Sequence, residues 1–423
     1  MATTTRSVSD VCAQAKAASR TLATLDAATK SVALEAMARA LEERSAEILE
    51  ANARDMEAGE RNDIGAALLD RLRLDEGRLA AIAGDVRTIA AQPDPVGETI
   101  ENWQLENGLD IRKVRVPFGV VAVVYEARPN VTADCSALCI KSGNAIVLRG
   151  SSIAAHANAV MAQVVAQAVE SAGLPAGSVS IVAGGDRGEL RELATAEGLV
   201  DLVIPRGGEG LKAVLKQHAT VPVIYAAAGN DHVFVDATAD LDDAVAITVN
   251  AKVQKPGVCN AAETLLVHSG IAAEFLPRVL GELRESGVEL RVDGRTLALA
   301  GELADSLAEA TEEDWATEFL ALILAVKVVD SVDEAIDHVD RYGSGHSEAI
   351  VTGSDESARA FTEGVDAAVV YVNASTRFTD GGVFGMGAEI GNSTQKLHAR
   401  GPIGARELTT FKYVVEGSGQ VRP

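Results

Sequence analysis

The stretch GVVAVVYEARPNVTADCSALCIKSGNAIVL, residues 119–148, decides the fold class of this chain. Residues 120–125 form a short apolar run typical of a buried strand, residues 131–142 have a helical pattern that Gly143 ends, and residues 145–148 form a second apolar run. A strand, a helix and a second strand in this order indicate a right-handed βαβ unit. The stretch therefore predicts a parallel sheet with helices on both faces.

The same alternation continues in both directions along the chain. It predicts helices at residues 152–171, 189–196 and 211–217 and strands at 179–182 and 202–204. After Asn230 a second series begins, with strands expected at 233–235, 263–267, 321–329, 349–352 and 368–372. We therefore expect two α/β domains, and parallel sheets of this kind bind nucleotides at the carboxyl ends of their strands.

Residues 7–90, before this region, have a helical pattern with one apolar stripe, formed by Leu34, Met37, Leu41 and Ile48. The segment 100–116 alternates weakly and contains Asn107-Gly108, a strong hairpin signal. Residues 407–416 are again strand-like, and we expect them to pair with this hairpin. A composite sheet of two distant segments is typical of a dimerisation arm.

Composition excludes several classes of function. With 423 residues, 47% of them hydrophobic, and a net charge of −23, the chain is typical of a globular protein of several domains, and the acidic balance argues against a nucleic-acid partner. No apolar run is long enough to cross a membrane, and the N-terminal residues lack a secretory pattern, so the cytoplasm is the expected compartment. Four cysteines without a CxxC pair predict neither a disulfide framework nor a metal site.

Cys259 is the candidate nucleophile. Pro256 and Gly257 force a tight loop before it, and the residues that follow it are small. Lys255 and the backbone N–H groups of this loop favour the thiolate, which is the reactive form of cysteine. From the residues alone, a small buried structural cysteine remains the alternative.

Two glycine-rich turns follow predicted strands. Arg206-Gly207-Gly208-Glu209-Gly210 joins a strand to a helix, so its N–H groups are a candidate pyrophosphate site. Residues 184–188, Gly-Gly-Asp-Arg-Gly, only half resemble the dinucleotide fingerprint. An ordinary turn is the alternative interpretation of both.

A nucleotide-binding α/β domain followed by a second domain with a loop cysteine resembles the aldehyde dehydrogenase superfamily. Five motifs narrow the resemblance to one of its branches, the γ-glutamyl phosphate reductases of proline biosynthesis, and the similarity covers nearly the whole chain. The motifs are VPFGVV at 116–121, YEARPNV at 125–131, KSGNA at 141–145, QKPGVCNA at 254–261 and YGSGHSE at 342–348.

The resemblance implies the roles of individual residues. Cys259 matches the catalytic thiol, and Asn130 matches the amide that shares the oxyanion hole with the backbone N–H of the cysteine. For the cofactor, the positions that match are Arg149 at the adenosine ribose, Gly207 and Gly208 at the pyrophosphate, and Glu318 at the nicotinamide ribose.

Two departures from the superfamily pattern are informative. Ala226 replaces the Glu that acts as hydrolytic base in ordinary aldehyde dehydrogenases, so phosphate rather than water should enter or leave. Ser152, after Arg149 and Ser151, replaces the acidic residue that holds the ribose hydroxyls in many NAD enzymes. A hydroxyl beside a cation suits the 2′-phosphate, and NADPH is therefore the expected cofactor.

These implications predict an NADPH-dependent reductase of L-glutamyl 5-phosphate that acts through a cysteine thioester. Candidates for the substrate's anionic groups are Arg128, Lys255, His346 and Arg377, although a structural role for His346 remains open. The rival functions are a coenzyme A-acylating aldehyde dehydrogenase and a catalytically silent binding protein. We also expect a homodimer or larger homo-oligomer and functional coupling to glutamate 5-kinase.

The expected architecture is an aldehyde dehydrogenase-like α/β fold with two parallel-sheet domains and a small β arm. The NADPH-binding domain is expected at residues 1–99 and 115–228, the catalytic domain at 229–403, and the oligomerisation arm at 100–114 and 404–423.

Overall fold

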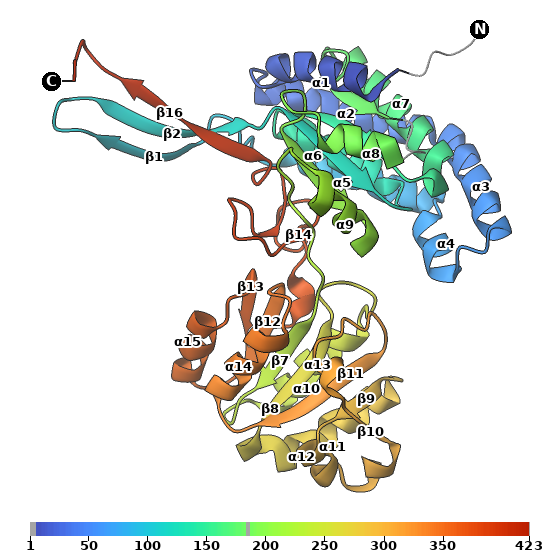
Figure 1. Cartoon of the computed structure of the whole chain (residues 1–423), viewed down its shortest axis with the longest axis vertical. Helices are drawn as coiled ribbons and strands as arrows, with labels where there is room; N and C mark the ends of the chain where they lie inside the picture. Colours follow the sequence, from blue (N-terminus) through green and yellow to red (C-terminus); the bar gives the residue numbers. More distant parts are fainter. Residues whose placement is uncertain (1–5, 183–186, 423) are drawn as a thin grey trace. The chain divides into compact units, whose positions relative to one another are not determined.

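The computed structural model of the chain describes residues 6–182 and 187–422, and the chain forms two compact units (Figure 1). The first unit comprises Met1–Ala226, Gly385–Gly391 and Ile403–Pro423, and the second comprises Ala227–Phe384 and Asn392–Pro402. Which unit holds the cofactor and which holds the catalytic residues stays a prediction, as do the domain boundaries given above.

Five helices open the first unit. Ser7, Asp26 and Asp75 fix the start of three of them, because each side chain accepts a hydrogen bond from the backbone N–H three residues later. The predicted apolar stripe is fully buried, but it spans two helices because the helical path breaks at Arg44. The helices are α1 (Val8–Leu22), α2 (Ala27–Glu43), α3 (Ser45–Arg61), α4 (Ala66–Leu72) and α5 (Glu76–Ala91).

A four-stranded parallel sheet forms the centre of the first unit, in the order β5-β4-β3-β6. Every residue of β3 is buried, as its continuous apolar sequence predicts. The strands are β3 (Val120–Tyr125), β4 (Ala145–Arg149), β5 (Val179–Ile181) and β6 (Leu202–Arg206). They alternate with α6 (Asn130–Lys141), η1 (Ser152–Ala154), α7 (Ala155–Ser171), α8 (Arg187–Ala194) and α9 (Glu209–His218), so the predicted βαβ order is confirmed.

The second unit contains a seven-stranded parallel sheet in the order β10-β9-β11-β8-β7-β12-β13. Its strands are β7 (Asp231–Val235), β8 (Ala262–His268), β9 (Glu289–Val292), β10 (Ala308–Glu309), β11 (Ile323–Val329), β12 (Ser347–Val351) and β13 (Val369–Val372). A short pair, β14 (Asn392–Ser393) and β15 (Gly401–Pro402), lies apart from this sheet.

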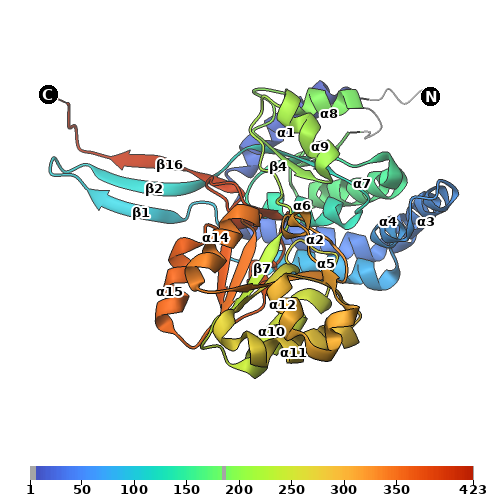
Figure 2. The same cartoon turned by 60° about the horizontal axis from the view of Figure 1, so that its bottom comes forward.

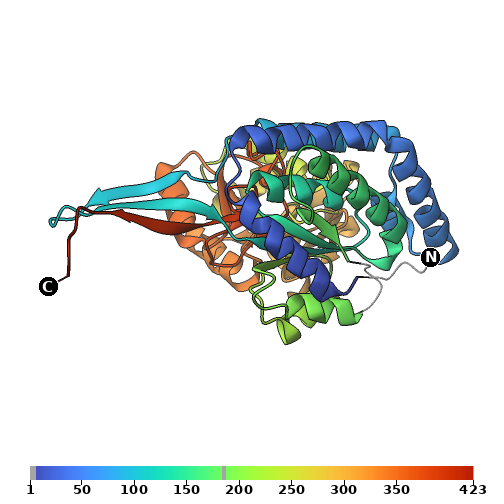
Figure 3. The ribbon, with the colours of Figure 1, turned by 90° about the horizontal axis from the view of Figure 1, so that it is seen from above.

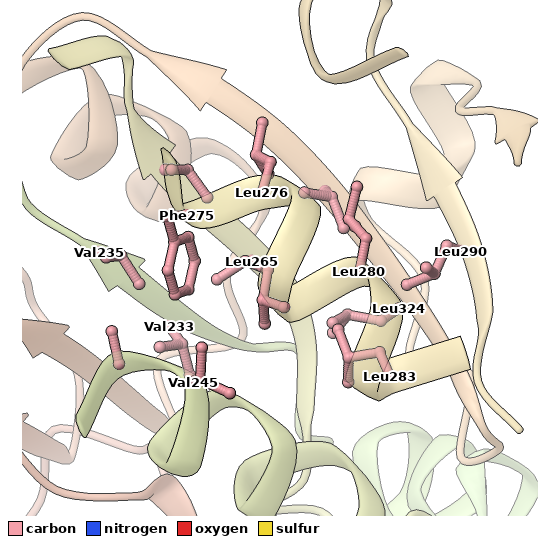
Figure 4. Packing of buried hydrophobic residues seen from close by; sticks show 14 of the residues in the cluster. Val233, Val235, Val245, Leu265, Phe275, Leu276, Leu280, Leu283, Leu290 and Leu324 are labelled. Carbon is pink, nitrogen blue, oxygen red and sulfur yellow. The ribbon is translucent and has the colours of Figure 1, made fainter. Parts of the chain in front are cut away.

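Helices cover both faces of this sheet. On one face, Phe275, Leu276 and Leu280 of α11 belong to the same buried cluster as Val233 and Leu265 of the sheet (Figure 4). On the other face of the sheet, side chains that alternate with these along the strands form a separate buried cluster with α14 and α15. The helices are α10 (Leu241–Val253), α11 (Ser269–Glu285), α12 (Gly294–Leu299), η2 (Gly301–Ser306), α13 (Glu312–Trp315), α14 (Val332–Tyr342), α15 (Asp355–Gly364) and η3 (Thr376–Phe378).

An antiparallel arm of three strands, β1 (Thr99–Gln104), β2 (Asp110–Pro117) and β16 (Thr409–Glu416), belongs to the first unit. The strands run side by side out of the helical part of that unit (Figures 2 and 3). Glu416 pairs with Asp110, so the predicted pairing of two distant segments is confirmed. The arm exposes Trp103, Phe411 and Tyr413. The ring of Tyr413 contacts the rings of Trp103 and Phe411 edge to face.

Candidate active site

Cys259 is the accessible cysteine of the four. It lies in the loop between α10 and β8 and is partly exposed, whereas Cys12, Cys135 and Cys139 are buried. Burial raises the pKa of the Cys12 thiol to about 11 and also raises the pKa of Cys135 and of Cys139. Those three thiols are therefore poor nucleophiles at neutral pH, and Cys259 is the one placed to react.

Gly229 packs directly against the backbone of Cys259. A Cβ atom at Gly229 would lie 1.5 Å from the carbonyl oxygen of Cys259, so no larger residue fits there. The N–H of Gly229 donates a 2.7 Å hydrogen bond to Oε1 of Glu318. The residue that the sequence assigns to the nicotinamide ribose is thereby held on the segment that supports the Cys259 loop.

Three neighbouring strands bring a histidine and an aspartate to Cys259. Asp231 is the first residue of β7, His346 directly precedes β12, and Cys259 lies shortly before β8. Because β7 lies between β8 and β12 and all three are parallel, their amino-terminal ends lie side by side. Nδ1 of His346 is 3.5 Å from Oδ2 of Asp231, and both side chains are buried.

The charge state of His346 depends on these two neighbours. Burial by itself would lower the pKa of His346, but the negative charge and hydrogen bonding of Asp231, together with a smaller contribution from the Cys259 thiol, raise it well above its usual range. These contacts favour the protonated form of His346, and burial raises the pKa of Asp231 as well, so the two buried groups compete for a proton.

A chain of three hydroxyl groups extends from His346. Oγ of Ser347 is 2.8 Å from Nδ1 of His346 and 2.6 Å from Oγ1 of Thr379, which is in turn 2.8 Å from the hydroxyl of Tyr371. The Asn260 amide donates a 2.8 Å hydrogen bond to the backbone oxygen of Thr379. The segment after η3 is thus fixed to the residue that follows Cys259.

Arg377 lies on the same side of the second unit. Its Nε donates a 2.8 Å hydrogen bond to Oε1 of Gln254, at the start of the cysteine loop. Burial lowers the pKa of Arg377, whereas Asp380 and Cys259 are near enough to act in the opposite direction. Lys255 is exposed in the same loop. The structure therefore groups Cys259, His346 and Arg377 within one unit.

Asn130 and Arg128 belong to the first unit, where they follow β3. Asn130 begins α6, and its amide donates a 2.9 Å hydrogen bond to Oδ2 of Asp134, one helical turn later. Burial raises the pKa of Asp134 to about 7. The predicted oxyanion-hole amide thus has its orientation fixed by a buried carboxyl group.

A cavity of about 720 Å³ lies beside β5 and α7 in the first unit. Binding sites for small ligands fall in the range of roughly 300 to 1,000 Å³, so the volume of this cavity suits a small ligand. Its lining includes Gly150 and Ser151, directly after the predicted Arg149, and also Arg6, Asn158, Gln163 and Val182. Ser152 is exposed at the start of η1.

The Gly207-Gly208 turn precedes α9 and already holds an anion. The N–H of Gly208 donates a 3.1 Å hydrogen bond to a carboxylate oxygen of Glu126. A Cβ at Gly207 would approach the carboxyl carbon of Glu126 to 2.7 Å, whereas the space beside Gly208 is open. This hydrogen bond shows that the N–H groups of the turn can bind a carboxylate oxygen. In the second glycine-rich turn, Gly184, Gly185 and Asp186 lie outside the described residues.

Sequence reasoning missed three residues of these sites, namely Gly229, Asp231 and Arg6. An Asp at the start of an otherwise apolar strand was the available signal for Asp231, because buried acidic residues are rare without a partner. Within residues 6–182 and 187–422, no group of three His, Cys, Asp or Glu side chains is arranged to hold a metal ion. The same residues include no helix with the length and apolar character of a membrane span.

Comparison with known proteins is consistent with this geometry. Residues 1–296 match the family model described as "Aldehyde dehydrogenase family". The gamma-glutamyl phosphate reductases of Thermoanaerobacter sp. and Thermobifida fusca are each 53% identical to the chain; the matches cover 97% and 99% of this chain and 98% and 99% of the relatives. The crystal structure of gamma-glutamyl phosphate reductase from Thermotoga maritima, 46% identical, superposes with a TM-score of 0.95 over 99% of this chain and all of that one.

The predicted fold class and the resemblance to one branch of the superfamily are therefore confirmed. The chain belongs to the aldehyde dehydrogenase family, within its group of gamma-glutamyl phosphate reductases.

Proposed function

We propose that this oxidoreductase catalyses the NADPH-dependent reduction of L-glutamyl 5-phosphate to L-glutamate 5-semialdehyde and phosphate, a step of proline biosynthesis. The observation that carries the proposal is the agreement between relatives of this name at 53% identity and an accessible cysteine in the matching loop. The rival coenzyme A-acylating function is not favoured, because the acetylating aldehyde dehydrogenase from Geobacillus thermoglucosidasius is only 20% identical and shares the fold alone.

The reaction begins at Cys259. Its thiolate attacks the acyl carbon, and the developing oxyanion is stabilised by the backbone N–H of the cysteine and the amide of Asn130. The C–O bond to phosphate then breaks, phosphate leaves with the electron pair and takes a proton from solvent, and a thioester remains on Cys259. The nicotinamide cofactor, if held by Gly207, Gly208 and Glu318 as proposed below, would supply a hydride at this carbon. The C–S bond breaks, and the electron pair returns to the sulfur as the semialdehyde forms.

The substrate's anionic groups are proposed to bind cations around Cys259. Arg377 is the strongest candidate, because it is half-buried and fixed to the cysteine loop by Gln254. Lys255 and Arg128 are further candidates for the phosphate or the α-carboxylate. His346 is buried against Asp231, and this favours contact with the thiol rather than with the distant end of the substrate.

Nicotinamide cofactors are general in this family, and we propose NADPH for this chain. The support is the segment Arg149-Gly150-Ser151-Ser152, in which Ser152 replaces the acidic residue expected at the ribose and whose Gly150 and Ser151 line the cavity. Gly207 and Gly208 would hold the pyrophosphate after Glu126 moves aside, and Glu318 would hold the nicotinamide ribose.

The arm is proposed to form a homodimer or a larger homo-oligomer. Its exposed aromatic side chains, Trp103, Phe411 and Tyr413, form the kind of apolar surface that protein interfaces cover. We also propose functional coupling to glutamate 5-kinase, because an acyl phosphate is labile and its transfer must be fast. The cytoplasm, where such precursors and NADPH are produced, is the proposed compartment.

The reverse reaction tests this function. The resemblance places Ala226 where a hydrolytic base would stand, so semialdehyde and NADP⁺ without phosphate should give a burst of about one NADPH per Cys259 and then stop. Phosphate should restore steady turnover, and Cys259→Ala should remove the burst. Steady oxidation without phosphate would indicate an ordinary aldehyde dehydrogenase. Turnover that depends on coenzyme A would indicate the acylating rival.

A further inference from the structure

His346 and Asp231 form a pair whose side chains are almost completely buried. Their side chains are 1% and 0% exposed. Nε2 of His346 has no hydrogen-bond partner within the described part of the chain. Its Nδ1 lies 2.8 Å from Oγ of Ser347 and 3.5 Å from Oδ2 of Asp231. Cys259 lies in the loop before β8, at the same end of the sheet, and acts in favour of the protonated ring. A buried imidazole between a carboxylate and a thiol favours a proton on the imidazole and a negative charge on the sulfur.

Other ionisable groups surround this pair, and the charged ones are bonded to partners of their own. Lys252 of α10 and Glu263 of β8 face Asp231 but are bonded to each other at 2.5 Å, fully buried. On the other side, His232 of β7 is bonded to Glu348 of β12. The remaining charged or titratable neighbours are Arg377, held by Gln254, and the Tyr371 phenol, whose pKa burial raises to about 12.

The second observation is the absence of the usual base. The resemblance places Ala226 where ordinary aldehyde dehydrogenases carry a hydrolytic Glu, so this chain has no carboxylate at that position that could take the Cys259 proton. We propose that His346, held between Ser347 and the Asp231 carboxyl group, accepts this proton and remains as the charge partner of the Cys259 thiolate. The inference rests on the proposed role of Cys259 as nucleophile. It extends that role by naming what keeps the nucleophile reactive.

One proton moves in this step, from the sulfur of Cys259 to the imidazole of His346, and no electron is exchanged. The proton stays on His346 while the thiolate attacks the acyl carbon. It is still there when the C–S bond breaks and the thiolate is restored. Asp231 does not touch the reacting atoms, so its role is to stabilise the charge of the ring from 3.5 Å, while Oγ of Ser347, 2.8 Å from Nδ1, holds the orientation of the ring.

Alkylation of Cys259 by iodoacetamide tests this directly, because the thiolate is the form that reacts and the other three cysteines are buried. In the unmodified protein, the rate should already be high at about pH 6.5, where a free cysteine of pKa about 8.5 is only about 1% ionised. In His346→Asn, the rate at this pH should fall at least about tenfold and recover at high pH. Asp231→Asn should shift the profile in the same direction by less.

His338→Asn is the matched control. His338 is also a buried histidine of the second unit, but burial lowers its pKa to about 2, so it is neutral and it is not in the group around Cys259. Its substitution should leave the alkylation profile unchanged. An unchanged profile in a folded His346→Asn protein would overturn the proposal.

A second measurement remains decisive if His346→Asn does not fold. The ultraviolet absorbance of the thiolate is followed from acid to alkaline pH in the unmodified protein and in Cys259→Ala. A Cys259-dependent change centred below pH of about 7 supports the proposal, and one centred near the ordinary value of about 8.5 overturns it. Both measurements omit substrate and cofactor, so a failure of the proposed reductase activity would not alter them.

Discussion

The carbonyl oxygen of Cys259 occupies the space that a side chain at Gly229 would need, with only 1.5 Å between that oxygen and a Cβ built on the glycine. Atoms this close cannot coexist, so any larger residue at Gly229 must move the cysteine loop. The same glycine also donates its N–H to Glu318. The nucleophile and the proposed nicotinamide contact therefore share one backbone support.

Gly229→Ala should accordingly reduce kcat by at least about a hundredfold, because displacements of about 1 Å at a reacting group can have effects of this size. Gly281→Ala is the control: Gly281 lies in α11 of the same unit, and a Cβ there meets nothing within 4 Å. It should retain full activity. Steady-state kinetics and the thermal midpoint of both variants check the prediction, and normal kcat in Gly229→Ala would contradict it.

Asn130→Ala should lower kcat by about 10²- to 10³-fold, the usual effect of removing one oxyanion-hole donor. KM should change little, since the amide is expected to act on the transition state more than on the bound substrate. Asn158→Ala removes another buried amide of the first unit, from the wall of the proposed adenosine cavity. That variant should alter the KM for NADPH instead. Equal effects on kcat in the two variants would argue against an oxyanion role for Asn130.

Ser152→Glu should weaken NADPH binding by roughly 1 to 3 kcal/mol, the cost of placing an unpaired charge against a ligand phosphate. NADH should lose less affinity, so the preference between the cofactors should move towards NADH. Ser306→Glu adds the same charge at an exposed residue of η2 in the second unit and should affect neither. Titration of both cofactors by fluorescence measures the effect. An equal loss for NADPH and NADH would place the 2′-phosphate elsewhere.

The strands and helices were predictable because their signals are local. Residues 119–148 carry their alternation of apolar runs within one short stretch, and Asn107-Gly108 marks a turn by its own conformational preference. Gly108 has a φ of +86°, as that turn requires. By contrast, β9 and β10 were missed because Glu289–Val292 and Ala308–Glu309 are short and carry charges.

The site was predictable only in part, for a physical reason. Cys259 was identified from its loop and from the family resemblance, whereas its position at the same end of the sheet as Asp231 and His346 depends on which strands are neighbours. Asp231 and the residue after His346 are 116 positions apart and meet only because β7 and β12 pair in parallel. Local periodicity contains no information about this pairing. The sequence therefore led to His346 as a substrate contact and gave no role to Asp231.

Asp134, which orients Asn130, should also make stability depend on pH. Burial raises its pKa from 3.8 to about 7, so between these values the folded state holds a proton that the unfolded state has lost. Stability from this group is therefore complete in acid and falls as pH rises towards 7. Asp134→Asn resembles the protonated side chain and should remove this fall. Over the whole range between the two pKa values the fall amounts to about 4 kcal/mol, at about 1.4 kcal/mol per pKa unit.

The difference in unfolding free energy between the unmodified protein and Asp134→Asn reports on Asp134 alone. Glu263 and Glu348 also have a pKa raised to about 7 by burial, but they contribute equally to both proteins and cancel. Denaturant unfolding at about pH 5 and at about pH 7.5 should then show a variant that gains stability relative to the original protein as pH rises. Parallel curves would mean that Asp134 is ionised in the folded protein. In that case a carboxylate, rather than a neutral carboxyl group, orients the Asn130 amide during the reaction.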